Sequence, residues 1–302
     1  MAWITRRAAL AGGTALAIGG AALAQPAPAA RAKGPLVWLD MDQKELDDAY
    51  DQSVYAPNQR LVTGRYVTNS EAVRARIGAP KRFSYGSTPI EGFDLYATTK
   101  PNAPVQVFVH GGAWRAGLAR DYATPAEMFV NAGAHFAVLD FNNVIETKGD
   151  LMAMAKQVRS AVAWICKNAA SFGGDPNRVF VSGHSSGGHL AGVVLVTDWK
   201  GEFGLPSDAV KGGVCCSGMF DLKPVRLSKR SEYVTFTDEV EQALSTQRHL
   251  DRLNCPVALC YGTLETPEFQ RQSRDFAAAV KAAGKPVSLQ DRKSTRLNSS
   301  HT

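Results

Sequence analysis

Short, predominantly apolar runs recur along most of the chain, separated by polar and glycine-rich segments. Such runs are typical of strands buried on both faces of a parallel sheet. They lie at residues 105–109, 135–141, 179–182, 213–216 and 256–261. Between them, apolar side chains repeat at intervals of three and four, as on one face of a helix. The alternation of the two patterns predicts a doubly wound α/β fold with a mostly parallel sheet.

Weaker patterns extend this prediction to a single domain at residues 36–290. Residues 82–85 and 93–98 suit opening antiparallel strands, and residues 45–50 suit a short helix. A last strand starts in the 280s, and we expect it to be cut short at Gln290, where the periodicity ends. No segment repeats at a fixed period, so one domain is sufficient.

The segment Gly183-His184-Ser185-Ser186-Gly187 directly follows one predicted strand and precedes an apolar helical stretch. This G-x-S-x-G arrangement is typical of a nucleophile elbow, in which a serine on a sharp strand-to-helix turn holds its hydroxyl above the sheet. Glycines two residues before and after the serine keep the turn free of clashing side chains. We therefore interpret Ser185 as the nucleophile of a hydrolysis reaction. An ordinary glycine-rich turn is the alternative.

A second glycine segment, His110-Gly111-Gly112, closes an earlier predicted strand. In sheets of this kind, that turn supplies backbone N–H groups to a developing oxyanion. We predict Gly111 and Gly112 as donors, with the N–H of Ser186, the residue after the nucleophile, as their partner. His110 is interpreted as structural. The alternative is that the segment is only a turn that ends a strand.

The acid of a catalytic triad is expected on a loop after a later strand. Glu265 occupies such a loop, because residues 256–261 form a strand and Thr266-Pro267 begin the next helix as N-cap and first-turn proline. We predict Glu265 as the acid. Glu268, in the first helical turn, is the runner-up, and its alternative role is to complement the helix dipole.

Four segments together resemble the arylformamidase-like esterases of the α/β-hydrolase superfamily, which are related to kynurenine formamidase. The resemblance runs from about Leu36 to Gln290 and implies the α/β-hydrolase fold. The family often has aspartate where this chain has Glu265. Trp114, beside the predicted oxyanion turn, is expected to contact an aromatic substrate, with core packing as the alternative. The matching segments are residues 110–114, 173–176, 183–189 and 262–269.

The histidine that should follow the acid is missing from its expected place. Residues 291–301 are polar, have no periodicity and resemble the in-frame translation of a sequencing-library adapter, so we interpret residues 291–302 as a non-native tail. A natural disordered tail is the alternative. His301 is a rival base, although a chain terminus would not hold its imidazole in place. We therefore expect the chain as given to be inactive.

Composition argues against nucleic-acid binding and against a metal site. Arg6 and Arg7 supply two of the six formal net positive charges and residues 291–302 supply two more, and no basic cluster with interleaved aromatics remains. Neither the histidines nor the cysteines have metal-ligand spacing. We interpret the five cysteines as small core residues rather than a disulfide framework; they are Cys166, Cys215, Cys216, Cys255 and Cys260.

The amino terminus is predicted to be an export signal. Paired arginines precede an Ala/Gly/Leu stretch with small residues at its end, as in a cleavable twin-arginine signal peptide over residues 1–24. Residues 25–35 suit a Pro/Ala-rich linker. We expect a periplasmic or secreted protein without membrane contact after cleavage. An uncleaved anchor is the alternative, but the apolar segment is short and rich in glycine and alanine.

Together these features predict a serine carboxylic-ester hydrolase that acts on small acyl or aryl esters through an acyl-enzyme, with no cofactor. An arylformamidase needs the same machinery and differs only in the shape of its pocket. A non-catalytic binding protein with this fold is an alternative from another class. Transfer of the acyl group to an alcohol instead of water also stays open. The expected partner is a small ester or formamide.

Overall fold

The computed structural model describes residues 31–292. The predicted signal peptide at residues 1–24, most of the predicted linker, and His301 in the predicted tail lie outside the described residues. The body from Pro35 onward forms one compact unit. In the described part of the chain, no helix combines the length and the apolar character needed to cross a lipid bilayer.

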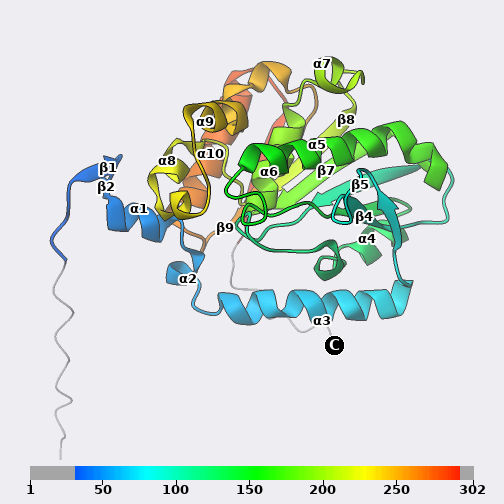
Figure 1. The fold of residues 1–302 in the computed structure, drawn as a ribbon, viewed down its shortest axis with the longest axis horizontal. Coiled ribbons are helices and arrows are strands. Elements are labelled where there is room, and N and C mark those ends of the chain that lie inside the picture. Colours follow the sequence, from blue (N-terminus) through cyan, green and yellow to red (C-terminus); the bar gives the residue numbers. More distant parts are fainter. Residues whose placement is uncertain (1–30, 293–302) are drawn as a thin grey trace, which may run out of the picture. The chain divides into compact units, whose positions relative to one another are not determined.

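An eight-stranded sheet forms the centre of this unit, in the order β10-β9-β8-β7-β5-β6-β4-β3 (Figure 1). Strand β4 pairs antiparallel with β3 and with β6, and all other neighbours pair in parallel. The predicted mostly parallel sheet with antiparallel opening strands is confirmed. The strands are β3 Lys81–Ser84, β4 Gly92–Tyr96, β5 Ala103–Val109, β6 His135–Leu139, β7 Gly174–His184, β8 Val210–Cys216, β9 Val257–Gly262 and β10 Val287–Arg292.

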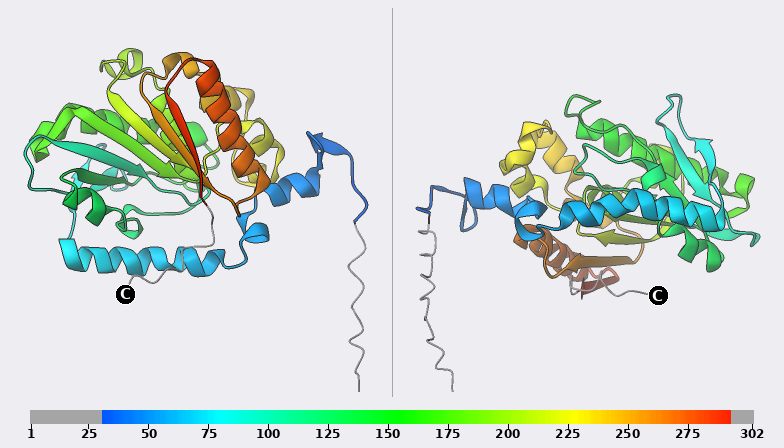
Figure 2. Two further views of the ribbon diagram at one scale, coloured as in Figure 1. Left: turned by 180° about the vertical axis from the view of Figure 1, so that it is seen from behind. Right: turned by 90° about the horizontal axis from the view of Figure 1, so that it is seen from below.

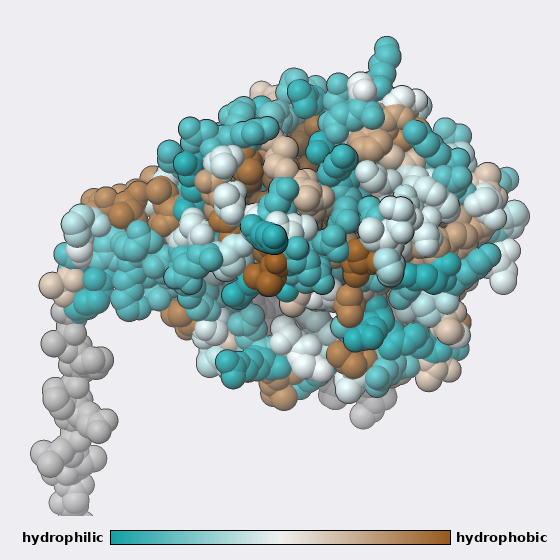
Figure 3. All heavy atoms as spheres, in the orientation of Figure 1, coloured by the Kyte–Doolittle hydropathy of each residue, from teal (hydrophilic) through white to brown (hydrophobic). Residues whose placement is uncertain are grey.

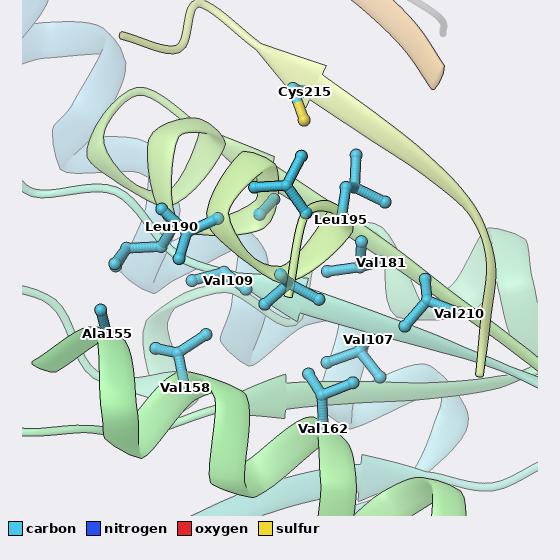
Figure 4. Close-up of a cluster of buried hydrophobic side chains, with 14 of the residues drawn as sticks. Val107, Val109, Ala155, Val158, Val162, Val181, Leu190, Leu195, Val210 and Cys215 are labelled. Carbon is cyan, nitrogen blue, oxygen red and sulfur yellow. The ribbon is translucent and has the colours of Figure 1, made fainter. Parts of the chain in front are cut away.

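Helices α5 (Leu151–Asn168) and α6 (Ser186–Leu195) pack over the middle strands, where Val158 and Leu190 meet the buried valines of β5 and β7 (Figure 4). Helix α10 (Pro267–Ala282) lies along β9 and β10 (Figure 2). The other α-helices are α1 Gln43–Ala49, α2 Gln52–Tyr55, α3 Gln59–Ile77, α4 Ala126–Asn131, α7 Trp199–Phe203, α8 Leu222–Leu227 and α9 Asp238–Leu244.

A small second sheet pairs β1 (Leu36–Trp38) with β2 (Met41–Asp42) ahead of α1. Leu36 and Leu39 are 60% and 61% exposed there, and Figure 3 shows the apolar surface over β1. Helix α1 begins after a capping box made by Asp42 and Glu45, so the predicted short helix exists and starts slightly earlier.

The register of the strands decides which side chains share a face of the sheet. Gly213 and Cys215 of β8 are paired with Val257 and Leu259 of β9, and these buried residues face α6 and α10. Successive side chains alternate between faces, so Val214 and its partners lie on the opposite face, where they line a groove of about 490 Å³ between β7, β8, β9 and β10.

The end of the sheet differs from the expectation that the last strand stops at Gln290. Strand β10 continues to Arg292, whose backbone pairs with Gly262 at the end of β9. Strand β7 also starts earlier than predicted, at Gly174. Both extensions follow from pairing with a neighbouring strand, which stabilises extended backbone where the side-chain pattern gives no signal.

Candidate active site

The structure places Ser185 at the turn between β7 and α6, with φ of 57° and ψ of −123°. A non-glycine residue with positive φ is uncommon, and such residues concentrate at functional sites. The elbow also needs its glycines. A side chain at Gly183 would put its Cβ 2.1 Å from the carbonyl oxygen of Gly187, and one at Gly187 would put its Cβ 2.1 Å from the carbonyl oxygen of Val109.

We expect Gly187→Ala to lower the free energy of unfolding by about 2–4 kcal/mol, because the new methyl group meets backbone atoms that cannot move aside. Gly64→Ala is the matched control. Gly64 lies inside α3, and a Cβ added there would have no neighbouring atom within 4 Å. Alanine at this position should therefore raise the free energy of unfolding by about 0.5–1 kcal/mol. Urea unfolding curves of both variants measure the difference, and equal curves would contradict the close packing of the elbow.

The predicted oxyanion turn lies against Ser185, the predicted nucleophile. A Cβ added at Gly111 would lie 3.3 Å from the Cβ of Ser185. Gly112 has φ of 124°, and a Cβ on it would lie 1.9 Å from the carbonyl oxygen of Ala116. Within residues 31–292, no backbone carbonyl accepts a hydrogen bond from the N–H of Gly111 or Gly112. Ser186 begins α6, where the first N–H groups have no partner inside the helix.

Glu265 lies on the loop between β9 and α10, as the sequence predicts. Its Oε1 accepts hydrogen bonds of 2.7 Å from the Ser217 hydroxyl and 2.7 Å from the N–H of Gly262. Its Oε2 is buried and has no hydrogen-bond partner among the described residues. Burial raises the pKa of the Glu265 carboxyl, and the hydrogen bonds from Ser217 and Gly262 oppose that rise. One carboxylate oxygen is therefore fixed and the other is available to a donor.

The runner-up acid, Glu268, is held in a different set of contacts. It is 2% exposed. Arg271, one turn further along α10, donates a hydrogen bond to each of its two oxygens, at 2.6 and 2.7 Å. The Tyr50 hydroxyl donates to Glu268 at 3.1 Å. The contact with Tyr50 ties α10 to the end of α1, which favours a structural role for Glu268 and leaves Glu265 as the better candidate acid.

No described histidine bonds to Glu265. His189 is buried in α6, and its Nε2 bonds the carbonyl of Leu244 at 2.9 Å; burial lowers its pKa to about 4. His110 is stacked on Phe141 with ring centroids 4.4 Å apart, and its Nδ1 lies 2.9 Å from the oxygen of Gly111. Within residues 31–292, the site thus brings together the candidate nucleophile, the candidate oxyanion donors and the candidate acid, and no described histidine is placed beside them as a base.

Trp114 continues the oxyanion turn with φ of 61°. Its ring is 2% exposed and packs edge-on against His189 at 5.3 Å and against Phe236 at 6.4 Å. This environment matches the core-packing alternative. A contact between Trp114 and an aromatic substrate stays a prediction.

Sequence reasoning missed Ser217. This residue follows β8 with φ of 52°, donates its hydroxyl to Glu265, and donates its N–H to the carbonyl of Cys260 at 2.8 Å. The signal was available in principle, because a polar residue directly after a central strand lies at the same edge of the sheet as the elbow. Among residues 31–292, no group of three histidine, cysteine, aspartate or glutamate side chains is arranged to hold a metal ion.

Known proteins resemble this chain over most of its length. The BD-FAE family model matches residues 93–212. Kynurenine formamidase of Danio rerio is 28% identical over 267 residues, which is 84% of this chain and 88% of that protein. Esterase LipC of Mycobacterium tuberculosis is 29% identical over 67% of this chain and 53% of its own length.

Solved structures confirm the fold. A protein of Silicibacter sp. tm1040 provisionally assigned as a thioesterase has a TM-score of 0.71 at 24% identity, covering 82% of this chain and 91% of its own. Esterase 2 of Thermogutta terrifontis with bound butyrate has a TM-score of 0.61 at 21% identity, over 72% and 84% of the two chains. The chain has an α/β-hydrolase fold, and its resemblance to arylformamidase-like esterases is confirmed.

Proposed function

We propose that this protein is a serine hydrolase that cleaves small acyl or aryl esters through an acyl-enzyme on Ser185. The observation that carries the proposal is the convergence of three strand ends. The elbow after β7, the Gly111-Gly112 turn after β5 and the Glu265 loop after β9 meet at one edge of the sheet. The similarity to formamidases and esterases supports a hydrolase of the ester or formamide type.

In the proposed reaction, the Ser185 hydroxyl attacks the carbonyl carbon and gives its proton to a histidine base. The oxyanion that forms accepts hydrogen bonds from the N–H of Ser186 and of the Gly111-Gly112 turn. Glu265 orients the base through Oε2 while Ser217 and Gly262 hold Oε1. The protonated base then gives its proton to the leaving alkoxide, and water repeats the sequence to release the acid from Ser185.

A binding protein without catalysis is the weaker proposal. A binding module has no need of a serine in a strained backbone conformation, or of donors that face it without internal acceptors.

Hydrolysis of an N-formyl arylamine is a second candidate function, favoured by the length of the match to kynurenine formamidase. A panel of p-nitrophenyl acyl esters and N-formyl anilides, assayed with a form of the protein that has an intact base, separates the two. We expect kcat/KM to be higher for short acyl esters. A preference of tenfold or more for the formyl anilides would reverse the assignment, and no turnover of either class would favour binding alone.

In a form of the protein that has an intact histidine base, Glu265→Gln should lower kcat by roughly 10²–10⁴-fold, because glutamine cannot stabilise a protonated histidine. Its oxygen can still accept from Ser217 and Gly262, so the loop should keep its structure. The pKa of Glu265 is raised in the folded state, so its carboxylate destabilises the fold above that pKa. We therefore expect the Tm of Glu265→Gln at neutral pH to equal or exceed that of the parent.

Glu268→Gln, three residues further along in the first turn of α10, is the matched control. This substitution breaks the buried ion pair with Arg271, so it should lower Tm clearly. Its kcat should stay close to that of the parent. If Glu268→Gln removed turnover and Glu265→Gln did not, the acid would have to be reassigned.

A further inference from the structure

Two cysteines that are far apart in the sequence meet beside the active site. Cys216 ends β8 and Cys260 lies in β9, and the parallel register pairs them directly. Their sulfur atoms lie 2.8 Å apart. Directly opposed residues on neighbouring strands are about 4.8 Å apart along the hydrogen-bonding direction, which falls within the Cα separation that disulfides span.

The other three cysteines are placed differently. Cys215 points to the opposite face of β8, where it is buried against α6 near Leu195 (Figure 4). Cys166 and Cys255 are also buried, and the Cys166 sulfur faces the carbonyl of Ala209 rather than another thiol. The close approach of two sulfurs thus belongs to the partly exposed pair.

The pair lies on the face of the sheet that small molecules can reach. Cys216 and Cys260 are both partly exposed. They follow Val214 and Ala258 by two residues, so their side chains lie on the same face as the groove of about 490 Å³. Val214 is 39% exposed. The cysteines do not line the groove itself, and their partial exposure gives the route by which a small oxidant would reach the two sulfurs.

The same residues support the catalytic groups. The carbonyl of Cys216 accepts the N–H of Ser185 at 2.8 Å. The carbonyl of Cys260 accepts the N–H of Ser217 at 2.8 Å, and Ser217 in turn holds Glu265. A covalent link between these cysteines would join the strand beside the nucleophile to the strand that carries the acid.

We propose that Cys216 and Cys260 are a redox pair that forms a reversible disulfide beneath the acid loop. The oxidant is a small or protein disulfide. One cysteine, as thiolate, attacks a sulfur of the oxidant and releases the first thiol; the second cysteine then attacks the mixed disulfide and releases the second. The two cysteine protons end on the released thiols. Two sulfurs of the protein are oxidised and the oxidant disulfide is reduced.

Oxidation is expected to take hours rather than seconds. The hydrogen bond to Cys260 and burial raise the pKa of Cys216 well above its usual range, which keeps the thiolate scarce at neutral pH. The inference does not depend on the proposed hydrolase activity, because it rests on the register of β8 and β9.

The test uses the full chain incubated with oxidised glutathione, quenched with acid, freed of glutathione by desalting, and then denatured for titration of its thiols. We expect the count to fall by two of the five thiols, without retained glutathione, and to recover fully on reduction. Cys216→Ser should abolish the loss, whereas Cys215→Ala, its neighbour in sequence, should keep it. Peptide mapping of the oxidised Cys215→Ala variant should then identify a disulfide-linked pair of peptides that contain Cys216 and Cys260.

Oxidised protein should also melt several degrees higher than reduced protein, because the link closes a long loop in the unfolded chain. Five thiols that survive prolonged oxidation of the folded wild type would overturn the proposal, and so would a cross-link that persists in Cys216→Ser. An unchanged Tm with the cross-link present would overturn its stabilising role. The wild-type thiol count needs no variant, so a misfolded mutant does not obscure the result.

Discussion

Replacing residues 291–302 with the sequence that the source gene encodes after Gln290 is expected to raise the turnover of p-nitrophenyl acetate by at least about 10³-fold. The reason lies at Glu265, whose Oε2 is buried and has no hydrogen-bond partner among the described residues. In a triad, the acid's free oxygen accepts from a histidine, and loss of any member leaves only the contribution of the oxyanion donors and of substrate binding. Initial rates of nitrophenolate release from both forms give the ratio.

His301 provides the control. If it were the base, His301→Ala in the 302-residue chain would remove most of the turnover. We expect it to change the rate by less than about twofold, since a terminus does not hold an imidazole in place. Equal turnover by the 302-residue chain and the restored form would contradict both the missing-base argument and the adapter interpretation.

In the restored form, Ser185→Ala should lower kcat by on the order of 10⁵–10⁶-fold, to the background rate. Alanine removes the attacking oxygen and keeps the backbone of the elbow, so the far-ultraviolet circular dichroism spectrum and the Tm should stay near those of the parent. A fluorophosphonate probe should label the parent on the peptide that contains Ser185 and leave the variant unlabelled. The labelling separates loss of the nucleophile from loss of substrate binding.

Ser182→Ala is the matched control for this experiment. Ser182 lies in β7, three residues before Ser185, and its hydroxyl accepts a hydrogen bond from the Gln106 side chain at 2.9 Å. Loss of the Ser182 hydroxyl in Ser182→Ala should leave the turnover within a few-fold of that of the parent. More than a few per cent of parental turnover in Ser185→Ala would contradict the assignment of the nucleophile.

The central part of the fold could be predicted because buried parallel strands produce continuous apolar runs. Helix α3 could not, because its apolar and polar residues are mixed around the helix and only Ser70 and Val73 are buried. Such a helix has no apolar stripe for a periodicity argument to find. The end of β10 at Arg292 could not be predicted either, because backbone pairing with β9 extends the strand into polar sequence.

The candidate site divides in the same way. Ser185, Gly111 and Glu265 could be predicted because each lies in a local segment whose residue types the turn itself demands. Ser217 and the pair Cys216–Cys260 depend on which residues of β8 and β9 stand opposite one another. A shift of one residue would send those side chains to the other face. Contacts of this kind come from the three-dimensional register, and no local motif encodes them.

Under the proposed mechanism, the backbone of Ser185 links catalysis to stability. At φ of 57° and ψ of −123°, any side chain costs folding free energy that glycine would not cost. The most stable residue at position 185 is therefore one that cannot react. Selection for thermal stability alone would therefore favour an inert glycine at this position over a reactive serine.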